Sequence, residues 1–356
     1  MKQITIKITN KCNYACNMCH FFGDDYKEDY FNNRPEFNRD MSLEEFEEIL
    51  KKVKEAGVEK INLTPNGEFF TYKKWREVLA LIQKYGMQST LTTNGGLLSE
   101  QDIKDAIDLG LSHVAVSIDS VHYDTYKIVR KPATKKAFEN AINAPILFKQ
   151  YSNNMRGGGG IYVQVQFTEQ PENKQEVRDM LDFYRPHKLD QITVNKMFVV
   201  YEGGNKHIGG NYTAIPYKVG TCANYGSYVV QTNGTVIGCC GETYFYPKIK
   251  SKVPNIFKQS LEECQKQSDY LYLNDSDFID YCKDCSIYSI WNDALLEKKF
   301  IENGYFAIQY AVNTSYFVIP EYLTNIPEDV LLFMYEKGMV GEIKKMLTNK
   351  VTVQHK

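Results

Sequence analysis

Three cysteines stand close together near the start of the chain: Cys12, Cys16 and Cys19, in the stretch CNYACNMC. A structural zinc site normally uses four tetrahedral ligands, so three thiols leave one metal position open. A 4Fe–4S cluster held by three thiolates has one iron without a protein ligand, and that iron can bind an external group. The spacing lets one short loop hold three irons of such a cluster, with a zinc site, a redox site or a chance grouping of thiols as alternatives.

The other six cysteines are separated from Cys19 by about two hundred residues, which predicts a second site. Cys264 falls on a predicted amphipathic helix and is expected to pack there. Cys240 is a candidate hydrogen-atom donor to a substrate radical, with a buried free thiol as the alternative. Four thiols suit zinc and iron–sulfur equally. They are Cys222, Cys239, Cys282 and Cys285.

Strand-like and helix-like patterns alternate between the two cysteine groups. Residues of alternating or β-branched character predict strands at 4–9, 60–64, 88–95, 113–119, 161–167 and 191–198. Amphipathic patterns predict helices at 42–57, 72–86, 99–110, 134–150 and 173–184. Ser42 and Glu45 are placed for a capping box, and Gly57 for the helix end.

Strand-then-helix units in this order predict an α/β fold with a parallel sheet and right-handed crossovers. An open doubly wound sheet and a partial (β/α)6 barrel related to the TIM barrel both fit the pattern. Chemistry in both folds gathers at the carboxyl ends of the strands. Polar loops at 65–70, 92–95 and 117–120 lie there together with the cysteine loop.

We expect three segments along the chain: a barrel at 1–196, a smaller domain at 197–290 and an extension at 291–356 of unknown role. In the second, Asn233-Gly234 predicts a tight β-hairpin turn, followed by a short helix. The composition gives a formal net charge of −2 and 43% hydrophobic residues. No apolar run, signal peptide or basic block stands out, which predicts a cytoplasmic protein without nucleic-acid or membrane partners.

The motif CNYACNMC, placed after the first strand, resembles the signature of radical S-adenosylmethionine (radical SAM) enzymes. The resemblance implies a partial (β/α)6 barrel with a 4Fe–4S cluster on Cys12, Cys16 and Cys19. It implies that the free iron binds the amino and carboxylate groups of S-adenosylmethionine. Reductive cleavage then yields a 5′-deoxyadenosyl radical, which abstracts a hydrogen atom from the substrate.

The same resemblance implies a cofactor-binding set in the strand-end loops. Asn66-Gly67-Glu68-Phe69 is similar to the family's Gly-Gly-Glu-Pro segment at the methionyl amino group, but its first and last residues differ. A glycine suits close backbone approach, and a carboxylate suits an ammonium group. A surface turn and a surface salt bridge are the alternatives for Glu68 and Arg130. The implied set is Met18 near the adenine, Gly67, Glu68, Asn94, and Ser117 with Arg130 near the carboxylate.

The second cysteine group resembles the SPASM/twitch extension found in one branch of that family. Gly234-x4-Cys239 and the later CKDC segment carry the likeness, while the further cysteines of the full pattern are missing after Cys285. This implies a small β-hairpin-plus-helix domain with a single auxiliary 4Fe–4S cluster, closed by four thiolates and serving electron transfer. A zinc ribbon is the alternative. In all, the resemblance covers roughly residues 1–290.

The expected reaction is oxidation of a substrate radical, with the auxiliary cluster as electron acceptor, as in an aminocyclitol dehydrogenase of this branch. The cluster loop begins at residue 12, so no peptide-recognition domain precedes it, which favours a small polar sugar or cyclitol. A peptide maturase, an epimerase and a non-catalytic iron–sulfur or zinc protein are the alternatives. A reducing donor such as flavodoxin or ferredoxin is expected. The candidate pocket residues, for which a solvated loop and ordinary strand ends are the alternative, are Asp24, Asp25, Glu28, Asp29, Gln164, Gln166, Glu169, Asn195 and Lys196.

Overall fold

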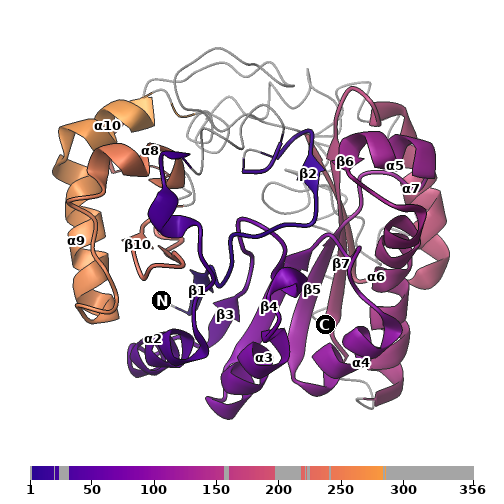
Figure 1. Cartoon of the computed structure of the whole chain (residues 1–356), viewed down its shortest axis with the longest axis horizontal. Helices are drawn as coiled ribbons and strands as arrows, with labels where there is room; N and C mark the ends of the chain where they lie inside the picture. The colour runs from indigo at the N-terminus through magenta and orange to yellow at the C-terminus, as the bar shows by residue number, and fades with distance from the viewer. Residues whose placement is uncertain are drawn as a thin grey trace, which may run out of the picture.

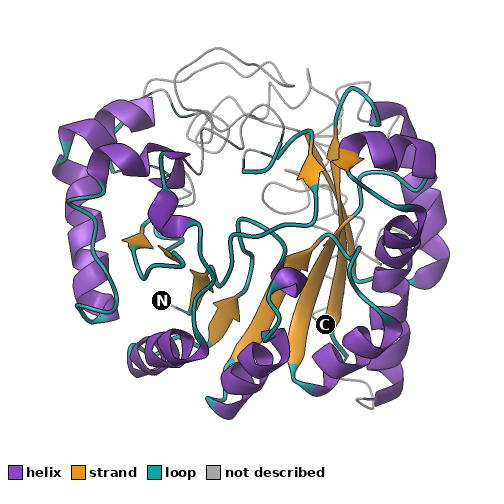
Figure 2. Cartoon of the chain, viewed as in Figure 1, coloured by secondary structure: helices purple, strands orange, loops and turns teal. Residues whose placement is uncertain are grey.

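A curved eight-stranded sheet, with helices packed along one face, forms the body of the chain (Figures 1 and 2). Its strand order is β10-β9-β1-β3-β4-β5-β7-β8. The strands are β1 (Gln3–Ile6), β3 (Lys60–Asn62), β4 (Gln88–Thr93), β5 (Leu111–Ser117), β7 (Tyr162–Glu169), β8 (Gln191–Lys196), β9 (Val229–Val230) and β10 (Val236–Ile237). The computed structural model describes residues 2–19, 21–23, 32–155, 160–196, 218–220, 222, 225–239, 242–283 and 285.

Strands β1, β3, β4, β5, β7 and β8 pair in parallel, which confirms the predicted α/β class. The helices are α2 (Leu43–Glu55), α3 (Trp75–Lys84), α4 (Glu100–Asp108), α5 (Tyr123–Val129), α6 (Lys135–Met155), α7 (Val177–Tyr184), α8 (Glu242–Ile249), α9 (Leu261–Asn274) and α10 (Ser276–Lys283). Short 3-10 turns occur at Pro35–Phe37, Phe69–Thr71, Lys174–Glu176 and Arg185–His187. Among the described residues, no helix is long and apolar enough to cross a membrane.

Local sequence signals set several helix ends. The Glu45 amide donates to Ser42 Oγ at 3.1 Å, and Glu45 Oε2 accepts from the Ser42 amide at 2.8 Å, so the predicted capping box is present. Gly57 follows α2 with φ of +77°, a conformation that favours glycine. These signals fix where α2 begins and ends, and thus how the chain enters β3.

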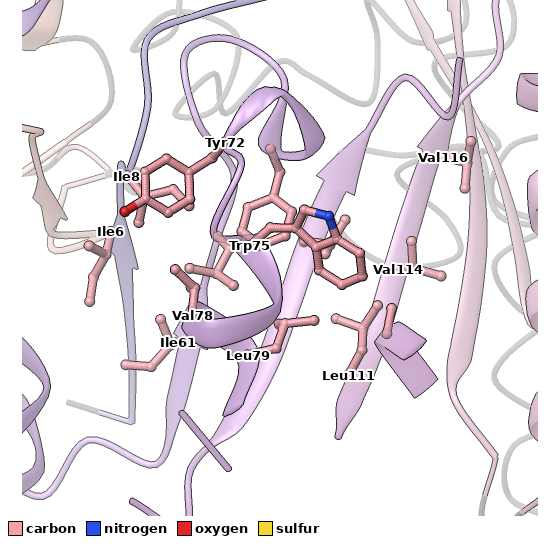
Figure 3. Packing of buried hydrophobic residues seen from close by; sticks show 14 of the residues in the cluster. Ile6, Ile8, Ile61, Tyr72, Trp75, Val78, Leu79, Leu111, Val114 and Val116 are labelled. Carbon is pink, nitrogen blue, oxygen red and sulfur yellow. The ribbon is translucent and has the colours of Figure 1, made fainter. Parts of the chain in front are cut away.

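The two faces of the sheet differ in chemistry because side chains alternate along each strand. One face is apolar and packs against the helices; Figure 3 shows Ile6, Ile61 and Val114 near Trp75 and Val78 of α3. The other face, here called the polar inner face, carries amide, hydroxyl and imidazole side chains at matching register positions. Its described members include Thr5, Asn62, Thr90, Thr92, His113, Ser117, Gln164, Gln166 and Thr193.

The hairpin predicted around Gly234 is present and joins the main sheet. Val230 pairs with Val236 in antiparallel register, and Gly234 has φ of +82°. Strand β9 pairs in parallel with β1, so the C-terminal hairpin continues the sheet beside the first strand. The expected boundary at residue 197 and the extension at 291–356 lie outside the described residues.

A second, two-stranded sheet was not predicted from the sequence. It pairs β2 (Ala15–Cys16) with β6 (Arg130–Lys131) in antiparallel register. Two-residue strands are too short to show a period of two. The sheet attaches the cysteine loop to the end of α5.

Candidate cluster and cofactor site

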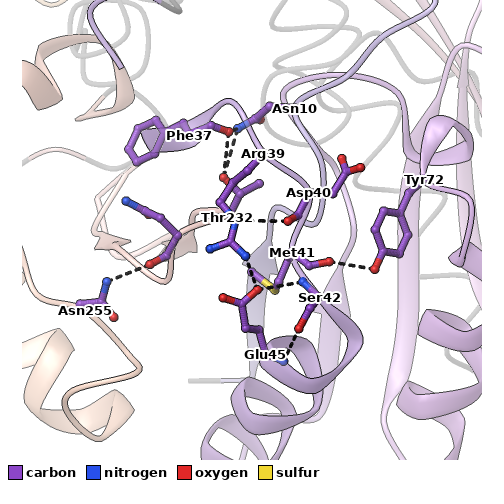
Figure 4. Close-up of polar contacts among 11 residues, drawn as sticks. Asn10, Phe37, Arg39, Asp40, Met41, Ser42, Glu45, Tyr72, Thr232 and Asn255 are labelled. Carbon is purple, nitrogen blue, oxygen red and sulfur yellow. Dashed lines mark hydrogen bonds and ion pairs between the residues drawn. The ribbon is translucent and has the colours of Figure 1, made fainter. Parts of the chain in front are cut away.

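The cysteine loop is fixed at its start by a hydrogen-bonded junction (Figure 4). The side-chain Nδ2 of Asn10 donates to the Phe37 carbonyl and lies 3.4 Å from Thr232 Oγ1. Thr232 Oγ1 in turn donates to the same carbonyl at 2.9 Å. Because Asn10 and Thr232 are buried, these bonds hold the chain just ahead of Cys12.

The middle of the loop is held by β6. Cys16 lies directly opposite Arg130 in the two-stranded sheet, and the Asn17 amide donates to the Val129 carbonyl at 3.0 Å. The guanidinium Nη1 of Arg130 lies 3.9 Å from Cys16 Sγ. A predicted cluster ligand and a predicted cofactor ligand are therefore neighbours.

The loop that contains Gly67 contacts the chain at Lys11, directly before the cysteine loop. The Glu68 amide donates to the Lys11 carbonyl at 2.8 Å. A Cβ on Gly67 would lie 2.0 Å from that carbonyl oxygen, a distance that no side chain tolerates. Close approach of two backbones thus already accounts for glycine at this position, where the sequence predicted close approach to a ligand.

The Glu68 carboxylate joins this loop to the end of β4. Its Oε1 accepts from Thr93 Oγ1 at 2.7 Å and from the Phe70 amide at 3.2 Å, and its Oε2 accepts from the Asn94 amide at 2.7 Å. Burial raises the pKa of Glu68, and these hydrogen bonds oppose the rise. Asn94 Nδ2 donates to Asn13 Oδ1 in the cysteine loop at 2.9 Å.

Arg130 forms a buried ion pair with Asp119, which follows β5. Its Nη2 lies 2.6 Å from Asp119 Oδ2, and the two side chains are 6% and 0% exposed. Asp119 Oδ1 accepts from the Thr168 amide at 2.9 Å. Burial opposes the charge on Arg130, but Asp119, Cys16 and Tyr126 together outweigh it and raise the guanidinium pKa. The Nε of Arg130 is buried without a hydrogen-bond partner within the described structure.

Ser117 and Met18 complete the expected cofactor set. Ser117 is the last residue of β5 and lies opposite Gln166 of β7. Met18 is partly buried and packs against the main hydrophobic core. Hydrogen bonds and close contacts thus connect Glu68, Asn94 and Arg130 to the cysteine loop. Ser117 lies two residues before Asp119, the acid that holds Arg130.

Burial controls the protonation of the three thiols. It raises the pKa of Cys12 to about 12 and also raises the pKa of Cys16, where the Arg130 charge opposes it. Burial raises the pKa of Cys19 as well, against hydrogen bonds from the backbone amides of residues 21–23. Because cluster ligands are thiolates, loading iron at these positions must displace protons.

The residues present fit a 4Fe–4S cluster with a bound cofactor. A cavity of about 310 Å³ adjoins the loop and is lined by Cys12, Asn13 and Tyr14 among others; Cys16 and Cys19 are not in its lining. Within the part of the chain that the structure describes, no three His, Cys, Asp or Glu side chains converge as for one metal ion. Cluster thiolates bind different irons and lie further apart. The Arg130 charge and its unpartnered Nε suit an anionic group beside them.

Side chains of the polar inner face form hydrogen bonds with one another. Gln164 Nε2 donates to Thr193 Oγ1 at 2.7 Å, and Gln164 Oε1 lies 3.3 Å from His113 Nε2. Gln164 and Gln166 lie on this face. Glu169 is an odd number of positions from Gln166 along β7 and therefore belongs to the opposite face of the sheet. Asn195 and Lys196 of β8 lie opposite Thr168 and Glu169 of β7. The other candidate pocket residues lie outside the described residues; they are Asp24, Asp25, Glu28 and Asp29.

Three described cysteines of the second group, Cys222, Cys239 and Cys282, lie near a pair of stacked tyrosines. The Cys222 amide donates to Tyr272 Oη at 2.8 Å, and the rings of Tyr225 and Tyr272 stack with centroids 3.7 Å apart. Cys222 and Cys282 pack against the same small hydrophobic cluster. Cys239 follows Gly238, where a Cβ would meet the Tyr225 ring at 2.5 Å.

The remaining cysteines of this group differ in what the structure shows. The Cys285 amide donates to the Cys282 carbonyl at 3.3 Å, which keeps the CKDC pair together. Cys264 is fully buried in the main core, as expected for packing. Cys240, the candidate hydrogen-atom donor, lies outside the described residues.

Two residues of the site were missed by the sequence reasoning. Asp119 sits inside the strand-end motif SIDS, and a carboxylate directly after a buried strand is a usable signal for it. Asn13, which binds Asn94, lies between two cysteines and has no pattern of its own. Only the fold shows that Asp119 contacts Arg130 and that Asn13 contacts Asn94.

The curved parallel sheet and the thiol loop at its carboxyl edge define an α/β protein of the partial-barrel type. Residues 6–161 match the model of the Radical SAM superfamily, and the chain therefore carries a radical SAM domain. A GTP 3′,8-cyclase of Staphylococcus haemolyticus is 23% identical over 207 residues, which are 57% of this chain and 56% of the cyclase. The chain spans about half the length of the curated relatives it matches.

Solved structures share the fold. Streptococcus suis SuiB bound to S-adenosylmethionine matches with a TM-score of 0.56 and 13% identity, over 81% of this chain and 71% of SuiB. Native anSMEcpe with bound AdoMet matches with a TM-score of 0.55 and 16% identity, over 80% of this chain and 83% of anSMEcpe. These matches confirm the partial TIM-like barrel over the alternative of an open doubly wound sheet.

Proposed function

We propose that the chain is a radical SAM enzyme that binds a 4Fe–4S cluster on Cys12, Cys16 and Cys19. When bound, the cluster and S-adenosylmethionine supply reductive cleavage of the sulfonium and a 5′-deoxyadenosyl radical that abstracts a substrate hydrogen atom. The observation that carries the proposal is the convergence of Glu68 and Arg130 on the loop of the three thiols.

The residues of this convergence have the chemistry that the cofactor requires. Arg130 Nε is a buried donor suited to the methionyl carboxylate, with Ser117 nearby in sequence on β5. Glu68 Oε2 accepts a hydrogen bond from the Asn94 amide and has further lone-pair capacity for the methionyl ammonium. We assign Met18 to the adenine, and Gly67 and Asn94 to the walls of the same site.

The polar inner face supports a small polar substrate. Its amide and hydroxyl groups, with Gln164 bonded to Thr193, match a ligand that carries many hydroxyl groups. We propose dehydrogenation of a sugar-like or cyclitol-like molecule. The substrate radical loses one electron and one proton, the electron passing to an auxiliary 4Fe–4S cluster in a twitch-like domain. Its ligands would be Cys222, Cys239, Cys282 and Cys285. A flavodoxin or ferredoxin would reduce the first cluster.

The proposal is tested with anaerobically reconstituted full-length protein, S-adenosylmethionine and a strong reductant. Wild type should hold about eight irons and form 5′-deoxyadenosine. The Cys16→Ala variant should form none, whereas the buried Cys264→Ala control should behave as wild type. Zinc in place of iron, or no cleavage by an iron-loaded wild type, would refute the enzyme assignment. A screen of sugars and short peptides then identifies the substrate class.

A further inference from the structure

A buried ion pair lies between the cysteine loop and the end of β7. On one side, Arg130 Nη1 is 3.9 Å from Cys16 Sγ. On the other, Arg130 Nη2 is 2.6 Å from Asp119 Oδ2, and the carboxylate also accepts from the Thr168 amide. A charged pair therefore sits directly beside one thiol of the candidate cluster site.

The backbone fixes both members of the pair. Cys16 and Arg130 are directly opposed residues of β2 and β6. Asp119 is held through its carboxylate by Thr168, while Asn173 Nδ2 donates to the Asp119 carbonyl at 2.7 Å. Moving the Arg130 guanidinium away would break its ion pair with Asp119, and moving the Asp119 carboxylate would break its hydrogen bond from the Thr168 amide.

Charges in this position act strongly on electron transfer. Burial lowers the local dielectric screening, so a charge a few ångströms from a cluster has a large effect on its energy. A cation and a donor near a cluster sulfur stabilise the more negative, reduced state, and an anion stabilises the oxidised state. The two members of the pair therefore have opposing effects.

We propose that the Arg130–Asp119 pair sets the reduction potential of the cluster at Cys16, with Arg130 raising it and Asp119 limiting the rise. This inference rests on the proposed function, because it requires a cluster on the three thiols. Both residues act here as positioning residues through the ligand Cys16. Arg130 keeps its Nε for the cofactor and uses its two terminal nitrogens for the pair and the thiol.

The test is an anaerobic redox titration of the reconstituted full chain followed by electron paramagnetic resonance. The signal that changes on addition of S-adenosylmethionine identifies the cluster at the cysteine loop. The variants are Arg130→Met, Arg130→Lys and Asp119→Asn. Arg76→Met is the matched control, because Arg76 is ion-paired to Asp102 and Asp105 on the surface of α3 and α4.

Opposite shifts are expected from the two sides of the pair. At a fixed solution potential, Arg130→Met should lower the ratio of reduced to oxidised cluster at least about tenfold, or about 59 mV for one electron. Asp119→Asn should raise that ratio. Arg130→Lys keeps the charge and should shift less than Arg130→Met, and Arg76→Met should match wild type.

Other outcomes would overturn the inference. Shifts of the same sign, or midpoints equal to that of Arg76→Met, would show that the pair does not tune the cluster. If Arg130→Met fails to fold, an unchanged potential in both Arg130→Lys and Asp119→Asn has the same meaning. Loss of the cluster from every pair variant, with Arg76→Met intact, would indicate a purely structural role. A wild type without an iron–sulfur signal would refute the proposed function as well.

Discussion

Asn94 Nδ2 donates a hydrogen bond to Asn13 Oδ1 at 2.9 Å, which joins the end of β4 to the start of the cysteine loop. Asn94 also holds its own loop, since its Oδ1 accepts from the Gly96 amide at 2.9 Å and its amide donates to Glu68. A single asparagine thus connects three of the strand-end motifs.

Replacing Asn94 should therefore destabilise the protein even without cofactor. Asn94→Ala leaves the Gly96 amide and Asn13 Oδ1 without these partners, and we expect a loss of about 2 kcal/mol in the free energy of unfolding. Urea denaturation measures this directly. Asn274→Ala, which removes one exposed hydrogen bond on α9, should change stability by less than about 0.5 kcal/mol. Equal effects would contradict the role given to Asn94.

Gly67→Ala should disrupt the cysteine loop. The added Cβ would overlap the Lys11 carbonyl, and we expect a cost of about 3 kcal/mol together with lower iron content after reconstitution. Gly57→Ala is the matched control, because Gly57 has positive φ but nothing within 4 Å of the added carbon. It should cost only about 1 kcal/mol and keep full iron content. Normal iron loading of Gly67→Ala would show that the two loops can separate.

The second cysteine group should lose its iron independently of the first. In Cys282→Ala we expect iron to fall from about eight to about four per chain, with cleavage of S-adenosylmethionine retained in part. Cys264 is the control, because it packs in the main core. Unchanged iron in Cys282→Ala would remove the auxiliary cluster from the proposal.

His113 should make stability depend on pH. Burial lowers its pKa below 6.5, while Gln164 opposes the shift. Below about pH 6.5 the unfolded chain therefore binds a proton that the folded chain does not, and stability falls as the pH drops toward the folded pKa. His113→Gln should lose less stability than wild type between about pH 7.5 and pH 5.5 in urea denaturation. Parallel pH profiles would contradict this assignment.

The sequence predicted the six parallel strands and the main helices because their signals are local. Ser42 and Glu45 lie within one helical turn, and the strands alternate at a period of two. The three thiols could also be predicted as one group, since their spacing lies within one loop. The family resemblance added Glu68, Asn94 and Arg130 as predicted cofactor residues.

Contacts between distant segments could not be predicted from the sequence in this way. The bond between Asn13 and Asn94 spans 81 positions, and nothing in either segment indicates it. The contact of Arg130 with Cys16 needed β6 to be placed against β2, two strands too short to predict. The need for a glycine at position 67 became clear only from its close approach to the Lys11 carbonyl.

The position of β9 beside β1 has a consequence for biosynthesis. One edge of β1 stays open until residues near Val229 have left the ribosome, and Asn10 and Thr232 are 222 positions apart. An open strand edge is a site for wrong pairing, and closing so large a loop is slow. The thiol loop therefore reaches its final position only after most of the chain has been made. Iron insertion should thus follow translation of the hairpin.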